Sequence, residues 1–213
     1  MTALNQTTRV ADDIRTFFDT TQTDPAAIRA VMPAAIRLLA EGQPVSPAEI
    51  AGAANLPLPP VERALRELGD VEWTPDRRVE GMGLTPHETP HRIRIGEVDL
   101  FAWCAMDTLF FSAILDRRVE VESPDGTTGA PLRFATDGRR ILAADPPSIV
   151  VSWFVDPSAD GVRAAACQFG HFFASRDSAD AWLARYPTGG VLTLDEALDA
   201  SRQSAIADFG ATP

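Results

Sequence analysis

Three proline-containing breaks limit the first 70 residues of this chain to short helices. They fall at Asp24-Pro25, at residues 42–47 and at residues 55–60. Proline fixes its own φ and has no amide hydrogen, so it suits a first helical turn or a loop but disturbs a helix interior. Apolar residues between the breaks recur at helical spacing, which predicts helices over residues 10–18 and 26–41, a short helix capped at Ser46 and ending at Ala54, and a helix over residues 61–68. Pro33 can kink or divide the second of these.

This succession of short helices predicts a winged-helix-like region. Two short strands follow the helices, at residues 71–73 and 79–82, and would form the wing. The helix that would enter DNA, residues 61–68, carries two Arg and two Glu, and the whole chain has a net charge of -11. Because DNA binding depends on basic residues that neutralise phosphates, we expect no nucleic acid partner.

Beyond residue 84 strand and helix patterns alternate without a regular βαβ order, which indicates an α+β fold. We therefore predict two domains, a winged-helix-like one over residues 1–84 and an α+β one over residues 85–213. The expected strands include a hairpin over 93–101 that turns at Gly96-Glu97, and segments 119–123, 132–135, 148–155 and 164–173. The expected helices are 104–115, 177–186 and 194–206.

The composition narrows the cellular setting and the chemistry. The chain is 45% hydrophobic and 23% charged, has no run of the ~18 apolar residues that a membrane helix needs, and begins without the apolar core of a secretory signal. We expect a cytoplasmic protein with no membrane partner, in which the two cysteines stay reduced. A phosphate loop, a nucleophile elbow and a dinucleotide fingerprint are all missing from the sequence, so no cofactor is expected.

Cys104, Asp107 and Cys167 are the residues most suited to chemistry. Thiolates are the softest side-chain ligands, and a carboxyl three residues after Cys104 lies on the same helix face. Two thiols and one carboxyl could hold a mercury-like ion and deliver a proton beside it, since burial raises a carboxyl pKa toward neutrality. Ordinary roles also fit: buried cysteines often fill apolar space, and an acidic residue stabilises the first turn of a helix.

A zinc site is an alternative use of Cys167. His171 follows it by four residues, and His87 and His91 show the same spacing. Cysteine and histidine at such spacings can bind zinc. This arrangement would leave Cys104 unused and would place the histidine pair in a proline-flanked loop, so we favour the soft-metal interpretation.

Four segments in chain order resemble the organomercurial (alkylmercury) lyases. The core Trp-Cys-Ala-x-Asp-Thr-Leu around Cys104 is the most specific of them. The resemblance implies that the second domain is a lyase catalytic domain, with Cys104, Asp107 and Cys167 as its catalytic and mercury-binding residues. The resembling segments are GLTPHET at 83–89, FAWCAMDTL at 101–109, TGAP at 128–131 and HFFAS at 171–175.

The resemblance also implies a reaction. A thiolate bound to mercury would push electron density onto the mercury-bound carbon, Asp107 would protonate that carbon, and the second thiolate would capture the metal, giving a hydrocarbon and Hg(II). Mercury is then substrate and product, and small thiols or a mercuric reductase would accept it. The family's N-terminal region is thought to cover the active site. Family members often have tyrosine at Phe101 and a second cysteine at Gln168, so pocket polarity and product transfer can differ here.

Two other functions fit the same residues. One is a thiol-based sensor or binder of mercury or another metal, with a winged helix. The other is a divergent lyase homologue that uses Cys104, Asp107 and Cys167 on a different substrate. Substitution of Asp107 separates the enzyme from the binder, because only the enzyme needs the proton.

Overall fold

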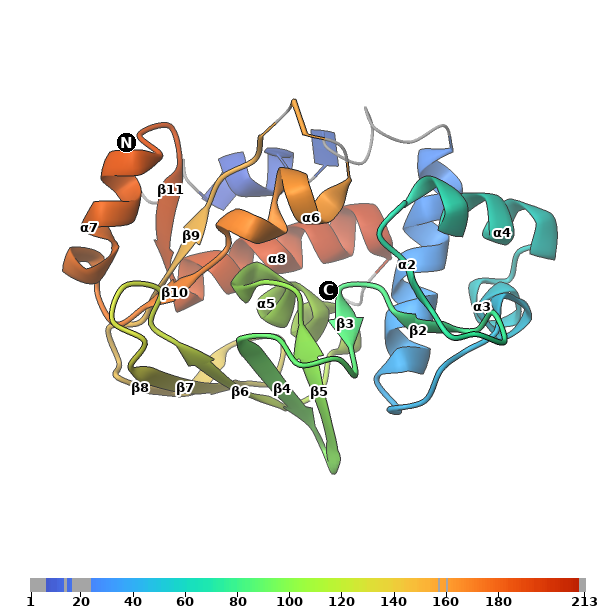
Figure 1. The fold of residues 1–213 in the computed structure, drawn as a ribbon, viewed down its shortest axis with the longest axis horizontal. Helices are drawn as coiled ribbons and strands as arrows, with labels where there is room; N and C mark the ends of the chain where they lie inside the picture. The colour runs from blue at the N-terminus through green and yellow to red at the C-terminus, as the bar shows by residue number, and fades with distance from the viewer. Residues whose placement is uncertain (1–6, 14, 17–23, 157, 160, 211–213) are drawn as a thin grey trace.

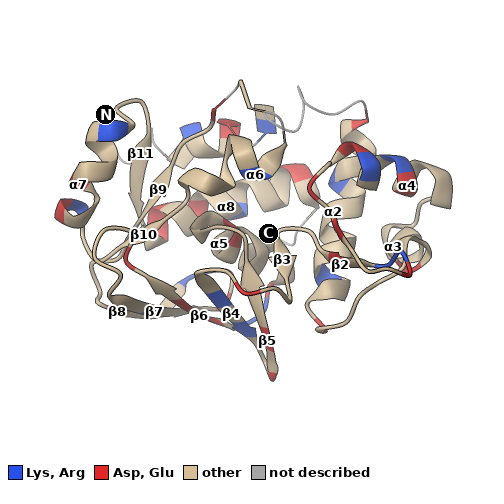
Figure 2. Ribbon diagram, viewed as in Figure 1, with Lys and Arg blue, Asp and Glu red and all other residues tan. Residues whose placement is uncertain are grey.

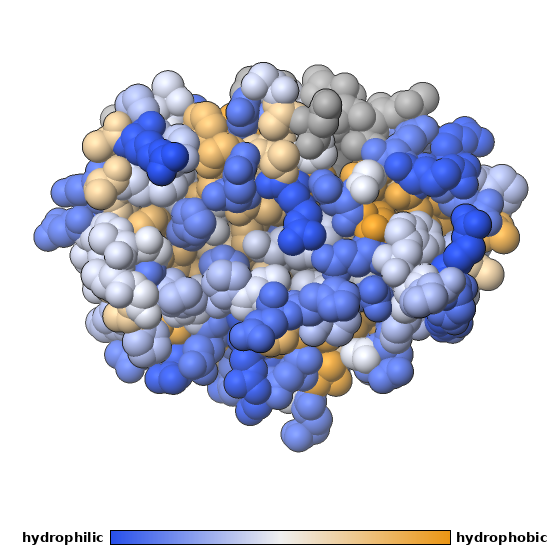
Figure 3. All heavy atoms as spheres, in the orientation of Figure 1, coloured by the Kyte–Doolittle hydropathy of each residue, from blue (hydrophilic) through white to orange (hydrophobic). Residues whose placement is uncertain are grey.

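The computed structural model describes residues 7–13, 15–16, 24–156, 158–159 and 161–210. Residues 7–13 and 15–16 are helical, as predicted for 10–18, although the last two residues of that prediction lie outside the described residues. Among the described residues no helix has the length and apolar character needed to cross a membrane. Figure 3 shows one face covered mostly by hydrophilic residues, with smaller hydrophobic areas between them.

The N-terminal helices form where the proline breaks predict them: α2 (Pro25–Leu39), α3 (Pro47–Ala54) and α4 (Leu58–Glu67). Asp24 caps α2 by accepting a hydrogen bond from the amide of Ala27, and Ser46 forms a capping box with Glu49 at the start of α3. Pro33 lies inside α2 without dividing it. Prolines in the first turn let α4 begin three residues before the predicted start.

A small hairpin follows these helices. Strands β1 (Glu72–Trp73) and β2 (Val79–Gly81) pair antiparallel, which confirms the two predicted strands. Val45 bridges to Val79 and joins the α2–α3 connection to the hairpin. Figure 2 shows both acidic and basic residues on α4, as its sequence requires.

A six-stranded antiparallel sheet occupies the middle of the chain, in the order β3-β5-β4-β6-β7-β8. Buried and exposed residues alternate along β4 and β6, so one face packs on the core while the other carries charged side chains. The predicted hairpin at Gly96 is confirmed as β4 and β5. The strands are β3 (Leu84–Thr85), β4 (His91–Ile95), β5 (Val98–Ala102), β6 (Val119–Pro124), β7 (Pro131–Thr136) and β8 (Ile141–Asp145).

Helix α5 (Ala105–Leu115) lies at the centre of the molecule (Figure 1). Asp107 is half-buried and all other residues of α5 are buried, because the helix packs against the sheet, against α2 and against α8 (Leu194–Phe209). One apolar core therefore runs from the N-terminal helices through α5 to the C-terminal helix. Mixed helices and antiparallel sheets confirm the predicted α+β class.

A second sheet of three strands, in the order β10-β9-β11, completes the fold with α7 (Arg176–Arg185). Its strands are β9 (Val150–Trp153), β10 (Phe172–Phe173) and β11 (Gly190–Thr193). The helices predicted at 177–186 and 194–206 are confirmed within three residues at each end.

The predicted strand over residues 164–173 is wrong. Helix α6 (Val162–Ala165) and the 3-10 turn η1 (Cys167–Phe169) occupy most of it, and only the last two predicted residues are in a strand. The amide of Phe169 donates to the carbonyl of Ala166 at 3.0 Å, and the amide of Ala166 donates to the carbonyl of Val162 at 2.9 Å. The backbone thus satisfies itself locally, helped by a run of alanines that favours helical turns.

Candidate active site

Cys104 stands where the sheet passes into the central helix. It lies two residues after the end of β5 and is the N-cap residue of α5, so the helix begins one residue later than predicted. The amide of Trp103 donates to the carbonyl of Gly83 at 2.9 Å, and the amide of Ala105 donates to the carbonyl of Gly170 at 3.1 Å. The backbone is therefore fixed on both sides of the thiol, which is buried at 3% exposure.

Cys167 approaches from a different part of the chain. It opens η1, and its Sγ lies 3.7 Å from Oδ2 of Asp107, to which the thiol can donate. The thiol sulfurs of Cys104 and Cys167 and a carboxylate oxygen of Asp107 all lie within 4.8 Å of one another. The structure thus brings together the three residues that sequence analysis selected, across 60 positions of sequence between Asp107 and Cys167.

The zinc alternative does not form: among the described residues, the one group of three or more His, Cys, Asp or Glu side chains placed to hold a metal ion is Cys104, Asp107 and Cys167. His87 is exposed and lies 3.2 Å from Glu80. His91 is buried, with Nδ1 2.8 Å from the hydroxyl of Ser123. The histidines therefore have separate local partners.

Burial sets the protonation of the site. It raises the pKa of Asp107 from 3.8 to about 7, although hydrogen bonds from both cysteines and the charge of Arg163 act in the opposite direction. The hydrogen bond from Cys167 lowers the pKa of Cys104, but burial and the charge of Asp107 outweigh it, so that pKa is raised. The hydrogen bond to Cys104, burial and Asp107 all raise the pKa of Cys167. Near neutral pH the pair therefore rests as thiols beside a carboxyl that can take or give a proton.

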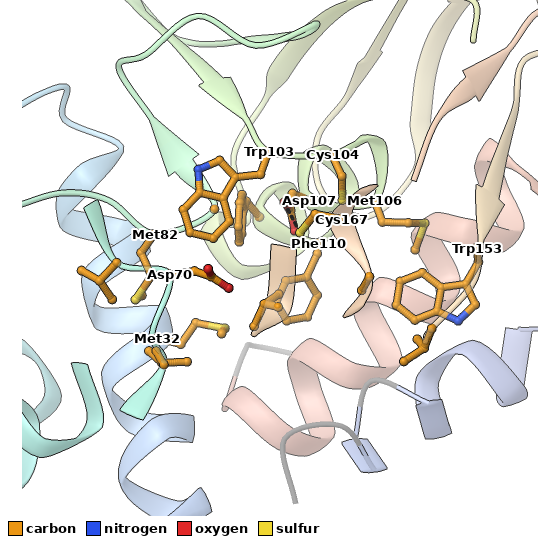
Figure 4. Close-up of a pocket in the computed structure, with 17 residues that line it drawn as sticks. Met32, Asp70, Met82, Trp103, Cys104, Met106, Asp107, Phe110, Trp153 and Cys167 are labelled. Carbon is orange, nitrogen blue, oxygen red and sulfur yellow. Dashed lines mark hydrogen bonds between the residues drawn. The ribbon is translucent and has the colours of Figure 1, made fainter. Parts of the chain in front are cut away.

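An apolar cavity of about 90 Å³ opens onto these three residues (Figure 4). Asp107 keeps part of its surface open toward it. The N-terminal region contributes to the wall through α2, the segment between α4 and β1, and the segment after β2. Aromatic residues supply much of the remaining lining, namely Trp103, Phe110, Phe111 and Trp153.

Glu72 links the wall of this pocket to the segment that carries Cys167. Its Oε1 accepts hydrogen bonds from the indole of Trp103 at 3.0 Å and from Arg163 at 3.3 Å. The guanidinium of Arg163 lies 4.6 Å from the centre of the Trp103 ring, a cation–π contact. Thr85 donates to Oε2 of Glu72 at 2.5 Å.

Asp70 makes a second link to the same segment. Its Oδ2 accepts the backbone amide of Arg163 at 3.0 Å and lies against Gly161, at the start of α6. Sequence analysis missed Asp70, Glu72 and Arg163, since none belongs to a recognisable motif. The only available signal was the position of Arg163, four residues before Cys167.

Comparison with known proteins agrees with this geometry. The family model "MerB: Alkylmercury lyase" matches residues 84–205. The alkylmercury lyase of Bacillus cereus is 36% identical over 167 residues, which cover 78% of this chain and 77% of that protein. The chain belongs to the alkylmercury lyase family. The resemblance found in the sequence is confirmed.

Other members of the alkylmercury lyase family show how far the likeness extends. The Staphylococcus epidermidis enzyme is 37% identical over 78% of this chain and 77% of its own length. The Pseudomonas putida enzyme is 31% identical over 71% of this chain and 72% of its own length. The crystal structure of the mercury-bound form of MerB2 superposes with a TM-score of 0.70 and 23% identity, covering 92% of this chain and 98% of that one. The fold is thus shared over nearly the whole chain.

The two departures from the alkylmercury lyase pattern lie outside the cavity lining. Phe101 is a half-buried residue of β5 that borders an open groove on the sheet. Gln168 is exposed, and its side-chain amide donates to the carbonyl of Ala164. Neither side chain lines the cavity beside the thiols.

Proposed function

We propose that this protein is an organomercurial lyase, which cleaves the carbon–mercury bond by protonolysis to give a hydrocarbon and Hg(II). The convergence of Cys104, Asp107 and Cys167 within 4.8 Å, at an apolar cavity of an alkylmercury lyase family member, carries this proposal. Thiolates are soft ligands suited to mercury, and an apolar cavity suits an alkyl or aryl group.

In the proposed reaction, one cysteine displaces the ligand X from R–Hg–X and its proton leaves with X. The second thiol then binds mercury and gives its proton to the Asp107 carboxylate. A pKa of about 7 lets that carboxyl accept a proton from a thiol that mercury has acidified and release it again. Asp107 returns the proton to the mercury-bound carbon as the C–Hg bond breaks. RH leaves, Hg(II) stays on two thiolates, and Asp107 is a carboxylate again.

The remaining features of the proposal concern the setting of the reaction. The protein would act in the cytoplasm without a cofactor, with mercury as substrate and product. Small thiols or a mercuric reductase would remove Hg(II) from Cys104 and Cys167. Neither nucleic acid nor membrane would be a partner. The net charge of -11 supports the first of these exclusions.

The N-terminal region has a structural task in this proposal. Residues 1–84 would form a winged-helix-like domain that covers the active site, and residues 85–213 would form the catalytic domain. Support comes from the order of α2, α3, α4 and the β1–β2 hairpin, and from the cavity wall, to which α2 and the segments after α4 and β2 contribute.

Asp107→Asn tests the function. The purified protein is incubated with phenylmercury or methylmercury and excess thiol, and release of benzene or methane is measured. Loss of a general acid costs roughly 10²–10⁴-fold in rate, so the variant should bind mercury but release little hydrocarbon. Asp116→Asn is the matched control, since Asp116 ends the same helix and pairs with Arg139 at the surface. It should retain wild-type turnover.

The result also separates the alternatives. Hydrocarbon release by wild type and by Asp116→Asn, but not by Asp107→Asn, is the expected outcome. Tight mercury binding without hydrocarbon from any of the three proteins would contradict the lyase and favour a thiol-based binder or a homologue with another substrate.

A further inference from the structure

Every methionine and cysteine in the part of the chain that the structure describes lines one cavity. The described methionines are Met32, Met82 and Met106, and all three line the cavity that contains Cys104 and Cys167. They come from separate elements: α2, the segment between β2 and β3, and the first turn of α5. Together with the two cysteines, the sulfur-containing residues thus reach the cavity from four parts of the fold. No single sequence motif accounts for this arrangement.

The three methionines are buried and line this cavity. Met32, Met82 and Met106 are exposed by 8%, 5% and 3% of their surface. In Figure 4, Met32 and Met82 lie on the side of the cavity that holds Asp70, and Met106 extends toward Trp153, with the cysteines between them. A soft ion that enters the cavity would therefore meet thioethers on both sides of the thiols.

Packing alone does not account for this placement. The chain is 45% hydrophobic, yet the rest of the described core is built from other apolar residues. Leucine fills nearly the same volume as methionine and replaces it at small cost. The property that methionine adds is a flexible side chain with a polarizable sulfur that can donate a lone pair to a soft metal.

We propose that Met32, Met82 and Met106 form an auxiliary thioether subsite that coordinates mercury on its way to and from the thiols. This inference rests on the proposed function. The thioether adds a lone pair to the mercury of an organomercurial or of the Hg(II) product, so no bond breaks and no proton moves. Because the donor is neutral, it holds mercury more weakly than a thiolate does, and the metal can pass on to Cys104 and Cys167.

A thioether subsite would compensate for the coordination that mercury loses when it enters the cavity. Mercury that enters loses part of its solvent or thiol coordination, and the wall offers few oxygen or nitrogen donors in return. Thioethers supply replacement ligands without adding charge to an apolar site. The competing explanation is that the methionines act only as an adaptable apolar wall for the organic group.

Methyl NMR distinguishes these two explanations. The full chain is labelled with [methyl-¹³C]methionine in a Cys104→Ser/Cys167→Ser background, which removes the stronger ligands. Single Met→Leu variants at 32, 82 and 106 assign three signals, and the fourth methionine of the sequence is Met1. The probes are mercuric ion, phenylmercury and benzene. Mercuric ion and phenylmercury should shift the three cavity signals, and benzene should leave them nearly unchanged.

Shifts with benzene and phenylmercury but not with mercuric ion would overturn the subsite, because an apolar wall responds to the ring and not to the metal. Unchanged cavity signals with all three probes would overturn it as well. The readout is independent of turnover. The wild-type protein could release no hydrocarbon while the methionine signals of the Cys104→Ser/Cys167→Ser protein still respond to mercuric ion. That result would contradict the lyase function and support the thioether subsite.

A second experiment keeps the thiols and removes only the thioether sulfurs. Biosynthetic replacement of methionine by norleucine exchanges each sulfur for a methylene group and preserves side-chain shape and flexibility. Mercury transfer from a small-thiol complex to Cys104 and Cys167 should slow several-fold. Leu142→Ala, which changes an exposed apolar side chain of β8 outside the cavity lining, should transfer mercury at the wild-type rate. Equal rates for norleucine and methionine protein would refute the proposal.

Discussion

Cys104 and Cys167 line the same cavity, but different kinds of structure hold them in place. We call the structure that holds each thiol its support. Cys104 joins a strand of the six-stranded sheet to the buried helix α5, and backbone hydrogen bonds hold the residues on both sides of it. Cys167 opens the 3-10 turn η1 just after the short helix α6, and the sheets do not extend to it. One thiol is thus placed by regular secondary structure, and the other by side-chain contacts that reach its segment from elsewhere.

Those contacts come from the N-terminal region. Asp70 accepts the backbone amide of Arg163, and Glu72 accepts a hydrogen bond from its guanidinium. Arg163 precedes Cys167 by four residues. The difference between the two supports teaches that the N-terminal helices and hairpin do more than close the cavity, because they help to position one of its two thiols.

Asp107 connects the two supports, and its removal should have the largest effect on stability. It belongs to α5 but contacts the thiol of Cys167. Its folded-state pKa is about 7, above the ordinary 3.8, because it is buried. The neutral carboxyl is therefore favoured in the fold: its contribution to stability is complete below about pH 4 and is lost as the pH rises to about 7. A shift of about three pKa units corresponds to about 4 kcal/mol.

Urea unfolding of wild type and Asp107→Asn across pH 4 to 8 measures this. The variant should be the more stable protein at pH 8, and the difference should vanish near pH 4. Asp116→Asn is a control of opposite sign, since a hydrogen bond from Arg139 lowers the pKa of Asp116. The charged Asp116 carboxylate therefore stabilises the fold at pH values above its ordinary pKa. The Asp116→Asn protein should be less stable than wild type at pH 8. A parallel pH dependence in wild type and Asp107→Asn would contradict the buried, uncharged carboxyl.

Gly170→Ala should disturb the rigid support of Cys104. A Cβ at this position would lie 3.2 Å from both Cβ and Sγ of Cys104. Gly170 has φ -86° and ψ 100°, which alanine adopts readily, so the effect is steric and not conformational. A thiol displaced by a fraction of an ångström should slow hydrocarbon release about tenfold, given how strongly rate depends on positioning.

Steady-state rates of hydrocarbon release, with circular dichroism to verify the fold, check this prediction. Gly52→Ala is the matched control, because nothing lies within 4 Å of the added carbon there. An unchanged rate in Gly170→Ala would mean that Cys104 has room to move, and that its support is no more rigid than that of Cys167.

The same contrast explains which parts of the site were predictable. The pairing of Cys104 with Asp107 follows from helix periodicity, which is local, so the spacing of three residues was sufficient. The strand predicted around Cys167 was wrong because short apolar segments fit strands and buried helical turns equally well. Local hydrogen bonds make the helical turns there, and the contacts of Arg163 with Asp70 and Glu72, which no local pattern encodes, attach the segment to the N-terminal region.

The fold shows a similar division. Long helices with caps, such as α2 and α8, were predictable because each end carries its own signal in Asp24 or in the Thr193–Glu196 capping box. The strands β3, β8 and β11 were missed. Two of them are edge strands of the six-stranded sheet, and β3 has only two residues. Such segments become strands because a neighbour is already in place to pair with them.

Glu72→Gln should have the smallest effect on stability of the three substitutions. Of the two thiols, it should change the accessibility of Cys167 alone. The substitution keeps the size of the side chain but removes the charge that pairs with Arg163, whose side chain is half exposed. Because exposed ion pairs are weak, we expect a loss of about 1 kcal/mol in unfolding free energy. The more telling result should be faster alkylation of Cys167 by a small reagent, resolved by peptide mass spectrometry, with Cys104 unchanged. Glu62→Gln, on the exposed face of α4, should alter neither thiol. Equal acceleration at both cysteines would show that Glu72 holds the cavity as a whole, and that the two supports are not independent.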